Sequence, residues 1–205
     1  MNKYTSKQNK PEDGNRIFAR GKIVNLNPNG SNYDIELFIR NGGGRQHTYL
    51  HFNCSNIALH LELKTGTTIH VYGHVENFID IRSKPAQRYV ADIITPEKTE
   101  LARYFRKEDF HFGFAPQMHF AKFFVAGEVT RVINNTTSKW IVLSIKDASG
   151  NIVNIQFSRR MRVADNFFKK GDYVYAYAIP ISTKKNISGQ DVNFITLIAE
   201  DIEIG

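Results

Sequence analysis

The sequence predicts an all-β protein with short helices, folded as two tandem five-stranded barrels. Apolar residues recur with a period of two along most of the 205-residue chain, as they do in half-buried strands. The stretches "LHFNCSNIALHLELKTG" (50–66) and "IQFSRRMRVADNFFKKG" (155–171) share one outline. Each has an alternating strand that ends in Phe, a short segment of helical period, a Lys and a Gly. Because the two copies begin half a chain length apart, we expect two similar domains.

The first half contains five strand-like segments and one short helical segment. The strands are expected at 19–26, 33–39, 47–52, 67–75 and 88–94. The helical pattern, about 56–64, is followed by Gly66, a residue type that commonly ends helices. The run "NGGG" (41–44) indicates a hairpin between the second and third strands.

The second half repeats this order. Its strands are expected at 123–133, 140–145, 151–157, 172–179 and 192–204. Gly127 matches Gly21 in the first strand, "DASG" (147–150) replaces the Gly-rich hairpin, and the helical segment 163–171 again ends in Gly. Three strands, a helix and two strands is the element order of the OB-fold, a small Greek-key barrel. The sequence therefore predicts two tandem OB-fold five-stranded Greek-key barrels.

These segments divide the chain into four parts. A polar N-terminal segment (1–15) precedes the first OB domain (16–96), and the second OB domain occupies 121–205. The connector between them (97–120) is aromatic-rich and is expected to be partly helical, because Thr95 followed by Pro96 is a helix-start signal. We favour packing of its aromatic residues on a barrel or a partner chain, with contact to bases as the alternative.

Composition and charge narrow the class of protein. With 41% hydrophobic residues, no segment that reaches the length of a membrane span and no apolar run at the N-terminus, we expect a soluble protein of the cytoplasm. Cys54 is the single cysteine, which excludes an intrachain disulfide. The formal net charge of +7 suits a polyanionic partner, although charges spread over a solvated surface would give the same value.

Several segments resemble the bacterial-type single-stranded DNA-binding proteins, in the form with two OB domains per chain. In both halves the interval from the third-strand Phe to the Gly after the helix is the same and is similar to that of the family (Phe52 to Gly66, Phe157 to Gly171). The segment "RVADNFFKKGDYVYAYA" (162–178) looks like the helix and fourth strand of that family, and "AQRYVADII" (86–94) looks like its last hairpin.

The resemblance implies a homodimer with four OB domains that binds single-stranded DNA. Recruitment of replication or recombination proteins is left open. The chain ends in "LIAEDIEIG", which alternates as a strand does, whereas the family usually ends in a flexible tail with an acidic tip. No membrane is implied as a partner.

An OB barrel that binds single strands needs flat side chains on which bases stack and a positive groove along the backbone. The resemblance makes Phe52 and Phe157 the first stacking candidates, although a strand Phe is more often part of the core. The other stacking candidates are Trp140, Tyr33, Tyr49 and Phe78. Alternation places Trp140 on the more exposed face of its strand and Tyr33 on the inner face.

Phosphate contacts are expected from Lys and Arg side chains near these rings. Arg159, Arg160 and Arg162 directly follow Phe157 and form the tightest cluster, so the second domain is expected to bind more strongly than the first. The other candidates are Arg20, Lys22, Arg40, Arg45, Arg82, Lys84 and Arg88 in the first domain, and Arg131, Lys139, Lys146, Lys184 and Lys185 in the second. For each of them, a solvated surface charge is the alternative.

The pattern of possible ligands and nucleophiles favours a binding protein over an enzyme. His47, His51 and Cys54 are close in sequence, but the chain has no paired-Cys motif, so we expect no metal and no other cofactor. No phosphate-binding loop, nucleophile elbow or H-E-x-x-H motif is present.

The predicted function is sequence-independent binding and protection of single-stranded DNA in replication, recombination or repair. Two alternatives stay open. One is an OB-fold replication or primosome module that acts mainly through protein contacts, and the other is an RNA-binding OB protein.

Overall fold

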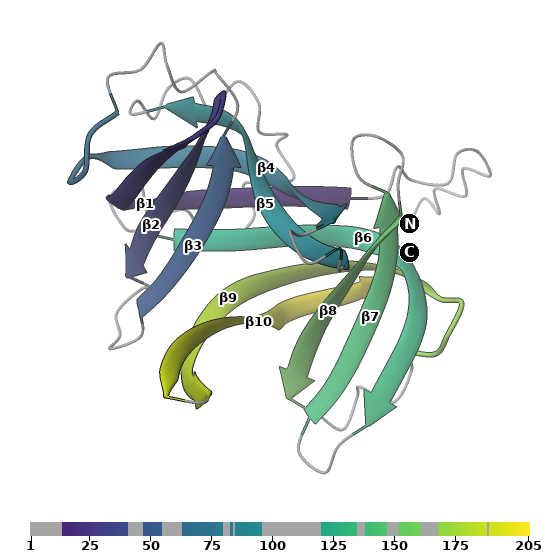
Figure 1. Cartoon of the computed structure of the whole chain (residues 1–205). Helices are drawn as coiled ribbons and strands as arrows, with labels where there is room; N and C mark the ends of the chain where they lie inside the picture. The colour runs from purple at the N-terminus through teal and green to yellow at the C-terminus, as the bar shows by residue number, and fades with distance from the viewer. Residues whose placement is uncertain are drawn as a thin grey trace.

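The computed structural model consists of two five-stranded barrels that share one ten-stranded sheet (Figure 1). It describes residues 14–40, 47–54, 63–79, 83, 85–95, 120–134, 138–146, 152–160, 168–187 and 189–205. The first barrel contains β1 (Gly14–Asn29), β2 (Asn32–Arg40), β3 (His47–Cys54), β4 (Thr68–Ile79) and β5 (Pro85–Thr95). The second contains β6 (Phe120–Asn134), β7 (Ser138–Lys146), β8 (Ile152–Arg160), β9 (Tyr173–Ile187) and β10 (Gln190–Ile204).

The strand pairing of each half closes a Greek-key barrel. β1 pairs with both β2 and β4, and β3 pairs in parallel with β5, so the first barrel closes in the order β1-β2-β3-β5-β4. β6 to β10 repeat the same pairings. This is the OB-fold, and the predicted fold class of two tandem OB barrels is confirmed.

All regular elements of the described residues are strands. Most of the predicted helical segments (56–64 and 163–171) and nearly all of the connector 97–120 lie outside the described residues. No helix in the described part of the chain is long and apolar enough to cross a membrane.

Alternate residues of each strand fill the two barrel interiors. In β2, Ile35 and Leu37 are buried while the residues beside them face outward, and in β7, Ile141 and Leu143 are buried in the same way. A period of two is the geometry of a strand with one face on a core. The alternation in the sequence therefore locates the strands and also indicates which side chains face the surface.

The repeat extends to individual close contacts between strands. A Cβ atom on Gly21 would lie 2.8 Å from the carbonyl oxygen of Phe38, and a Cβ on Gly127 would lie 2.4 Å from that of Ser144. Both distances are shorter than real Cβ contacts, so each first strand needs a glycine where it crosses the second strand. The predicted match of Gly21 with Gly127 is therefore a match of structural roles.

The glycines that follow the predicted helices also have equivalent roles. Gly66 has a φ of 95° and Gly171 a φ of 94°, which glycine adopts without the steric cost of a Cβ. The N–H of Gly66 donates to the carbonyl of Ile23 (2.8 Å), and the N–H of Gly171 donates to that of Val129 (2.9 Å). Each glycine thus attaches the chain to the first strand of its own barrel.

The two barrels are joined by their first strands. β1 and β6 pair antiparallel from Gly14 opposite Ala126 to Arg20 opposite Phe120. Ile17 lies opposite Phe123 at the centre of this register, and both side chains are fully buried. Since Ile17 precedes Gly21 by the same interval as Phe123 precedes Gly127, the two barrels are related by a pseudo-twofold axis through this central pair.

The second barrel covers an open edge of β3. β5 pairs with β3 only from Phe52 onward, which leaves the first half of β3 without that neighbour. β9 supplies partners there: the N–H of Tyr49 donates to Ser182 Oγ (3.1 Å), and Thr48 Oγ1 donates to the carbonyl of Pro180 (3.0 Å).

The first barrel covers the equivalent edge of β8. β10 pairs with β8 only around Phe157, and the β4–β5 hairpin contacts the earlier residues. Asn77 Nδ2 donates to the carbonyl of Ile152 (2.7 Å), and Gln87 Nε2 donates to that of Asn154 (2.8 Å). This reciprocal contact, together with the β1–β6 pairing, fixes the two barrels relative to each other.

Candidate nucleic-acid interface

Outward-facing residues of β1, β2 and β3 form an aromatic and basic cluster on the first barrel. Lys22, Phe38 and Tyr49 are aligned across the three strands, and residues aligned in this way project from the same face. The ring centroid of Phe38 is 5.5 Å from that of Tyr49 and 5.0 Å from that of His47. Arg40 lies opposite His47. We call these five residues the β1–β2–β3 cluster.

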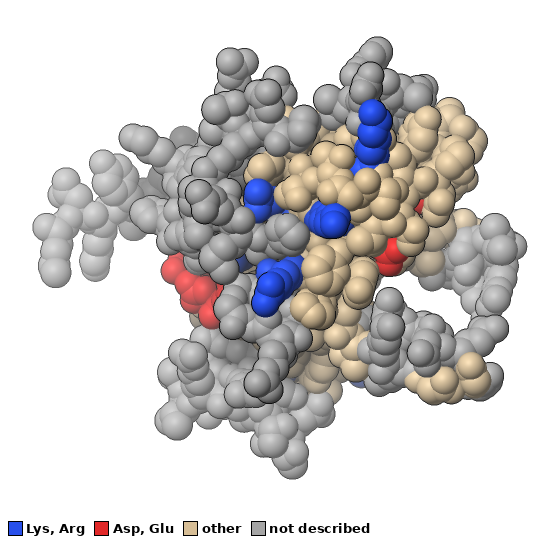
Figure 2. Space-filling view, turned by 90° about the vertical axis from the view of Figure 1, so that its left-hand side faces the viewer, with Lys and Arg blue, Asp and Glu red and all other residues tan. Residues whose placement is uncertain are grey.

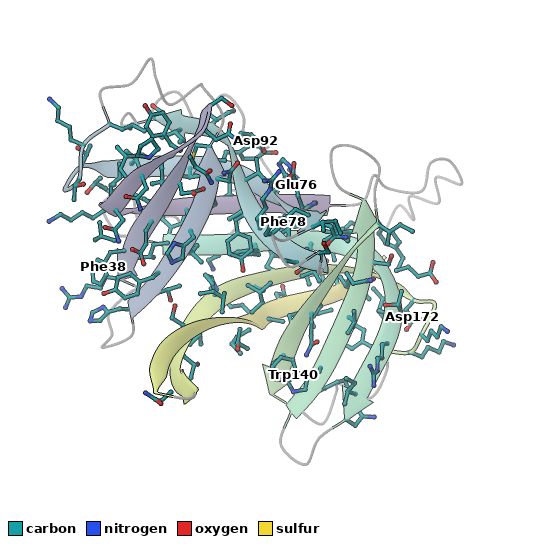
Figure 3. The ribbon with its side chains drawn as sticks, viewed as in Figure 1. Phe38, Glu76, Phe78, Asp92, Trp140 and Asp172 are labelled. Atoms are coloured by element: carbon teal, nitrogen blue, oxygen red, sulfur yellow. The ribbon has the colours of Figure 1, made fainter. Side chains whose placement is uncertain are left out.

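The cluster is accessible and positively charged. Lys22, Arg40 and His47 are exposed, and the rings of Phe38 and Tyr49 are partly exposed. Within the described part of the chain, no carboxylate forms an ion pair with Lys22 or Arg40. Figure 3 shows Phe38 on the outer side of β2. Such a surface combines uncompensated cations with flat apolar groups.

The face seen in Figure 2 is consistent with this charge distribution. It is the left-hand side of the molecule in Figure 1, the side on which β2 and β3 lie. Several Lys and Arg side chains stand out there among uncharged residues, and the acidic residues visible in this view lie to either side of them.

The opposite end of the β2–β3 face is polar and acidic. Asp34 and Glu36 lie on the same side of β2 as Phe38. Asn53 Nδ2 donates to Asp34 Oδ1 (3.0 Å), and His51 Nε2 lies 3.2 Å from Glu36 Oε1. Because carboxylates repel phosphates, an interface for a nucleic-acid backbone is restricted to the end of the face that carries the cluster.

The two rings that the family resemblance implied as main stacking residues are buried. Phe52 is 1% exposed and Phe157 is 0% exposed, and both belong to the hydrophobic core. Phe52 has the strand parity of Leu50 and Cys54, which point into the barrel. An enclosed ring cannot stack on a base, so the structure contradicts the stacking role predicted for Phe52 and Phe157.

The other four aromatic candidates lie in different environments. Tyr33 is partly buried and packs against the core, as its inward parity predicts. Trp140 is partly exposed on the outer side of β7, opposite Ser158 of β8. The Arg88 guanidinium lies 5.4 Å from the ring centroid of Phe78, near the end of β4. Of the six predicted rings, only Tyr49 belongs to the cluster.

The basic candidates with described side chains lie in different environments. Lys22 and Arg40 belong to the cluster. Arg88 is compensated, because its Nη2 and Nε lie 2.9 Å and 3.0 Å from Glu76 Oε2. Lys139 is 4% exposed, so the structure contradicts its prediction as a phosphate contact: a buried ammonium does not reach a strand on the surface.

The remaining basic candidates lie elsewhere or outside the described residues. Arg20 is partly buried on β1 opposite His70, and Arg131 is exposed on β6. Arg45, Arg82, Lys84 and Arg162 lie outside the described residues. For Lys146, Arg159, Arg160, Lys184 and Lys185 the structure describes the backbone and not the side chain.

Sequence reasoning missed Phe38 and His47 as members of the interface. The signal for Phe38 was present, because Leu37 and Ile39 alternate inward and leave Phe38 on the outer face. The contact between Phe38 and His47 depends on the register of β2 with β3. That register follows from the hairpin and is not contained in the pattern of either strand alone.

Two histidines and the cysteine considered as metal ligands point to opposite sides of β3. His47 and His51 are exposed, whereas Cys54 is inside the barrel. Burial, with a smaller effect from the charge of Asp34, raises the pKa of the Cys54 thiol to about 12. Among the described residues, no group of three His, Cys, Asp or Glu side chains is placed to hold a metal ion.

Comparison with solved structures shows which proteins share this fold. The wild-type single-stranded DNA-binding protein from Thermus aquaticus is 14% identical to this chain, with a TM-score of 0.63 over 95% of this chain and 94% of that chain. A deletion mutant of that protein is 13% identical, with a TM-score of 0.64 over 96% of each chain. No family model matches the sequence, and no curated protein matches it. At this identity the likeness shows a shared fold.

Proposed function

We propose that the protein binds single-stranded DNA without sequence preference, through the β1–β2–β3 cluster. The observation that carries this proposal is the juxtaposition of the partly exposed rings of Phe38 and Tyr49 with the cations of Lys22 and Arg40. Strands 2 and 3 are the face on which OB-folds bind oligonucleotides. The Thermus aquaticus proteins that share the fold are single-stranded DNA-binding proteins, which supports the same class of ligand.

Each part of the cluster has a separate task in this mechanism. A base stacks on the ring of Phe38 or Tyr49, which is worth about 1–3 kcal/mol for each base and does not depend on its identity, since every base has a flat face. Lys22 and Arg40 flank Phe38 and neutralise phosphates. Counterions are then released, so the affinity falls as salt rises, with a slope of about 0.7 for each phosphate contact in a log–log plot.

The mechanism favours single strands over duplex DNA. In a duplex, the base faces are stacked on one another and are not accessible to Phe38 or Tyr49. A protein that covers strands exposed in the cytoplasm during replication, recombination or repair would need this preference. The role in these processes is part of the proposal.

We also propose that two copies associate as a homodimer with four OB domains, as the resemblance of the sequence to the proteins with two OB domains per chain implies. Light scattering should therefore give a mass of about twice 23.5 kDa, and the mass of one chain would contradict the dimer.

Titration of a fluorescein-labelled oligo(dT) with the protein tests the proposed function. We expect saturable binding that weakens as the salt concentration rises. Unlabelled single-stranded DNA should displace the labelled oligonucleotide, and duplex DNA should not. Charge reversal of Lys22 and Arg40 to Glu should weaken binding and reduce the salt slope. The matched control is Lys170→Glu, also at an exposed lysine, next to Gly171 and on the side of the molecule where Figure 3 shows Asp172.

Two results would redirect the proposal. Absence of binding to any single strand at low salt would contradict it and favour a module that acts through protein contacts. An RNA homopolymer that displaces the label better than its DNA counterpart would favour the RNA-binding alternative.

A further inference from the structure

The pseudo-twofold symmetry identifies the residue of the second barrel that corresponds to Phe38. In the first barrel, a Cβ on Gly21 would collide with the carbonyl oxygen of Phe38. In the second, a Cβ on Gly127 would collide with the carbonyl oxygen of Ser144. Ser144 therefore occupies the position of Phe38 on the outer face of β7.

Register extends this correspondence to the neighbouring strands. Lys22 lies opposite Phe38 in the first barrel, and Glu128 lies opposite Ser144 in the second. On the other side, Tyr49 lies opposite Phe38 in the first barrel, and Asn154 lies opposite Ser144 in the second. The row that contains an ammonium and two rings in one barrel thus contains a carboxylate, a hydroxyl and an amide in the other.

The two corresponding rows therefore differ in shape and charge, while Lys146 lies opposite Ile152 as Arg40 lies opposite His47. Glu128 and Asn154 are exposed, and Ile152, which is 62% exposed, replaces His47. In addition, the carbonyl of Asn154 accepts a hydrogen bond from Gln87 of the first barrel, so part of this edge is already occupied by protein. The row formed by Glu128, Ser144 and Asn154 contains no aromatic ring, and Glu128 gives this row a negative charge.

We infer that the two barrels bind a single strand unequally: bases stack on the cluster of the first barrel, and the corresponding row of the second barrel stacks none. This inference rests on the proposed function. Glu128 repels phosphates where Lys22 attracts them. The inferred inequality of the barrels reverses the expectation from the sequence that the second domain binds more strongly. That expectation depended on the charges of Arg159, Arg160 and Arg162.

Matched double substitutions in the intact protein test the inequality. Phe38→Ala with Tyr49→Ala should weaken the affinity for oligo(dT) by roughly 30-fold or more, since each ring contributes at least about 1 kcal/mol. Ser144→Ala with Asn154→Ala, at the corresponding positions, should leave the affinity within about twofold. Thermal unfolding of each variant establishes that it is folded.

A gain-of-function variant provides an independent test that does not depend on removing large side chains. Glu128→Lys changes only an exposed charge, and together with Ser144→Phe and Asn154→Tyr it transfers the aromatic row to the second barrel. The single variant should bind oligo(dT) more tightly, and the triple variant should also saturate at a larger number of nucleotides.

The outcomes separate the inference from the proposed function. If the wild-type protein binds no single strands, the proposed function fails. If the wild type binds but the two double variants lose affinity equally, or the second-barrel pair loses more, the function stands and the unequal use of the barrels is overturned. Unchanged affinity in the Glu128→Lys variant would also overturn it.

Discussion

Phe38 and Phe52 lie on adjacent strands of the first barrel, and their strand parity determines what each ring can contact. Phe52 points inward with Leu50 and is enclosed by the core. Phe38 points outward next to the buried Leu37 and contacts His47 and Tyr49. A shift of one position along a strand therefore converts an aromatic residue from a core residue into part of a binding surface.

Cys54 provides a direct measure of how closed the first barrel is. Because burial raises its thiol pKa to about 12, the native protein holds almost no thiolate near pH 8. A thiol-reactive disulfide reagent should react with the native protein at least about 100-fold more slowly than with the protein unfolded in urea. The single cysteine makes the absorbance change unambiguous. Equal rates in the two states would show that the interior around Cys54 is open.

His74 should make stability depend on pH. Its Nδ1 lies 2.8 Å from Asp92 Oδ2 and its Nε2 lies 3.3 Å from Glu76 Oε1. The hydrogen bond to Asp92 is the main cause that raises its pKa above 6.5, against the opposing effect of burial. Folding therefore favours the protonated form, and this contribution is fully present below about pH 6.5 and is lost as the pH rises through the folded-state pKa.

Two measurements check this pH dependence. The imidazole proton signal that is absent in a His74→Gln variant should titrate above 6.5 in the NMR spectrum of the native protein. The same substitution should lower the free energy of unfolding more at about pH 6 than at about pH 9. A midpoint at or below 6.5 would contradict the role of Asp92.

At the scale of strands, the sequence pattern predicts which segments form strands better than it predicts where each strand begins and ends. The period of two located all ten strands of the described residues, because a strand with one face on a core produces that period locally. β1 begins at Gly14 and not at Ala19 as predicted. The additional residues pair with β6, a strand of the other barrel. Pairing between segments so far apart in the chain leaves no local signal in either segment.

The candidate interface was only partly predictable for the same reason. Lys22, Arg40 and Tyr49 were candidates because of their residue types. Their assembly with Phe38 and His47 depends on the registers of β1 with β2 and of β2 with β3. Register is set by hairpins and bulges across strands, so composition alone could not distinguish these residues from compensated or buried ones such as Arg88 and Lys139.

The close crossing of the first and second strands can be tested in both barrels. An Ala Cβ at position 127 would lie 2.4 Å from the Ser144 carbonyl oxygen, and one at position 21 would lie 2.8 Å from that of Phe38. Because a backbone oxygen has to move, Gly21→Ala and Gly127→Ala should each lower the free energy of unfolding by about 1–3 kcal/mol, as overpacking does. Gly127→Ala should cost more. Urea titration measures both, and a neutral effect at either position would contradict the close approach.

At the scale of the whole molecule, the two barrels should unfold together. The β1–β6 pairing and the contacts of Tyr49 with Ser182 and of Gln87 with Asn154 link the two barrels at three places. Trp140, the only tryptophan, lies in the second barrel, while circular dichroism reports on the strands of both. The two signals should give coincident urea transitions. Separate transitions would show that the barrels are independent units.

The fixed arrangement of the two barrels also affects how a single strand of DNA is bound. A single DNA strand that contacts the β1–β2–β3 cluster lies beside β9, because the N–H of Tyr49 is hydrogen-bonded to Ser182 of β9. Any phosphate contact made by the second barrel is then an intramolecular event with a high effective concentration. The second barrel can therefore extend a site whose base contacts are made on the first.

The affinity of a Phe38→Ala variant for labelled oligo(dT), relative to the wild type at the same salt concentration, tests the central claim most directly. We predict a loss of about 1–3 kcal/mol, roughly 5- to 150-fold in Kd, because one stacking surface is removed. The salt slope should stay unchanged, since Lys22 and Arg40 remain in place. A folded variant that binds as tightly as the wild type would show that single strands do not stack on this face, and the proposed interface would be wrong.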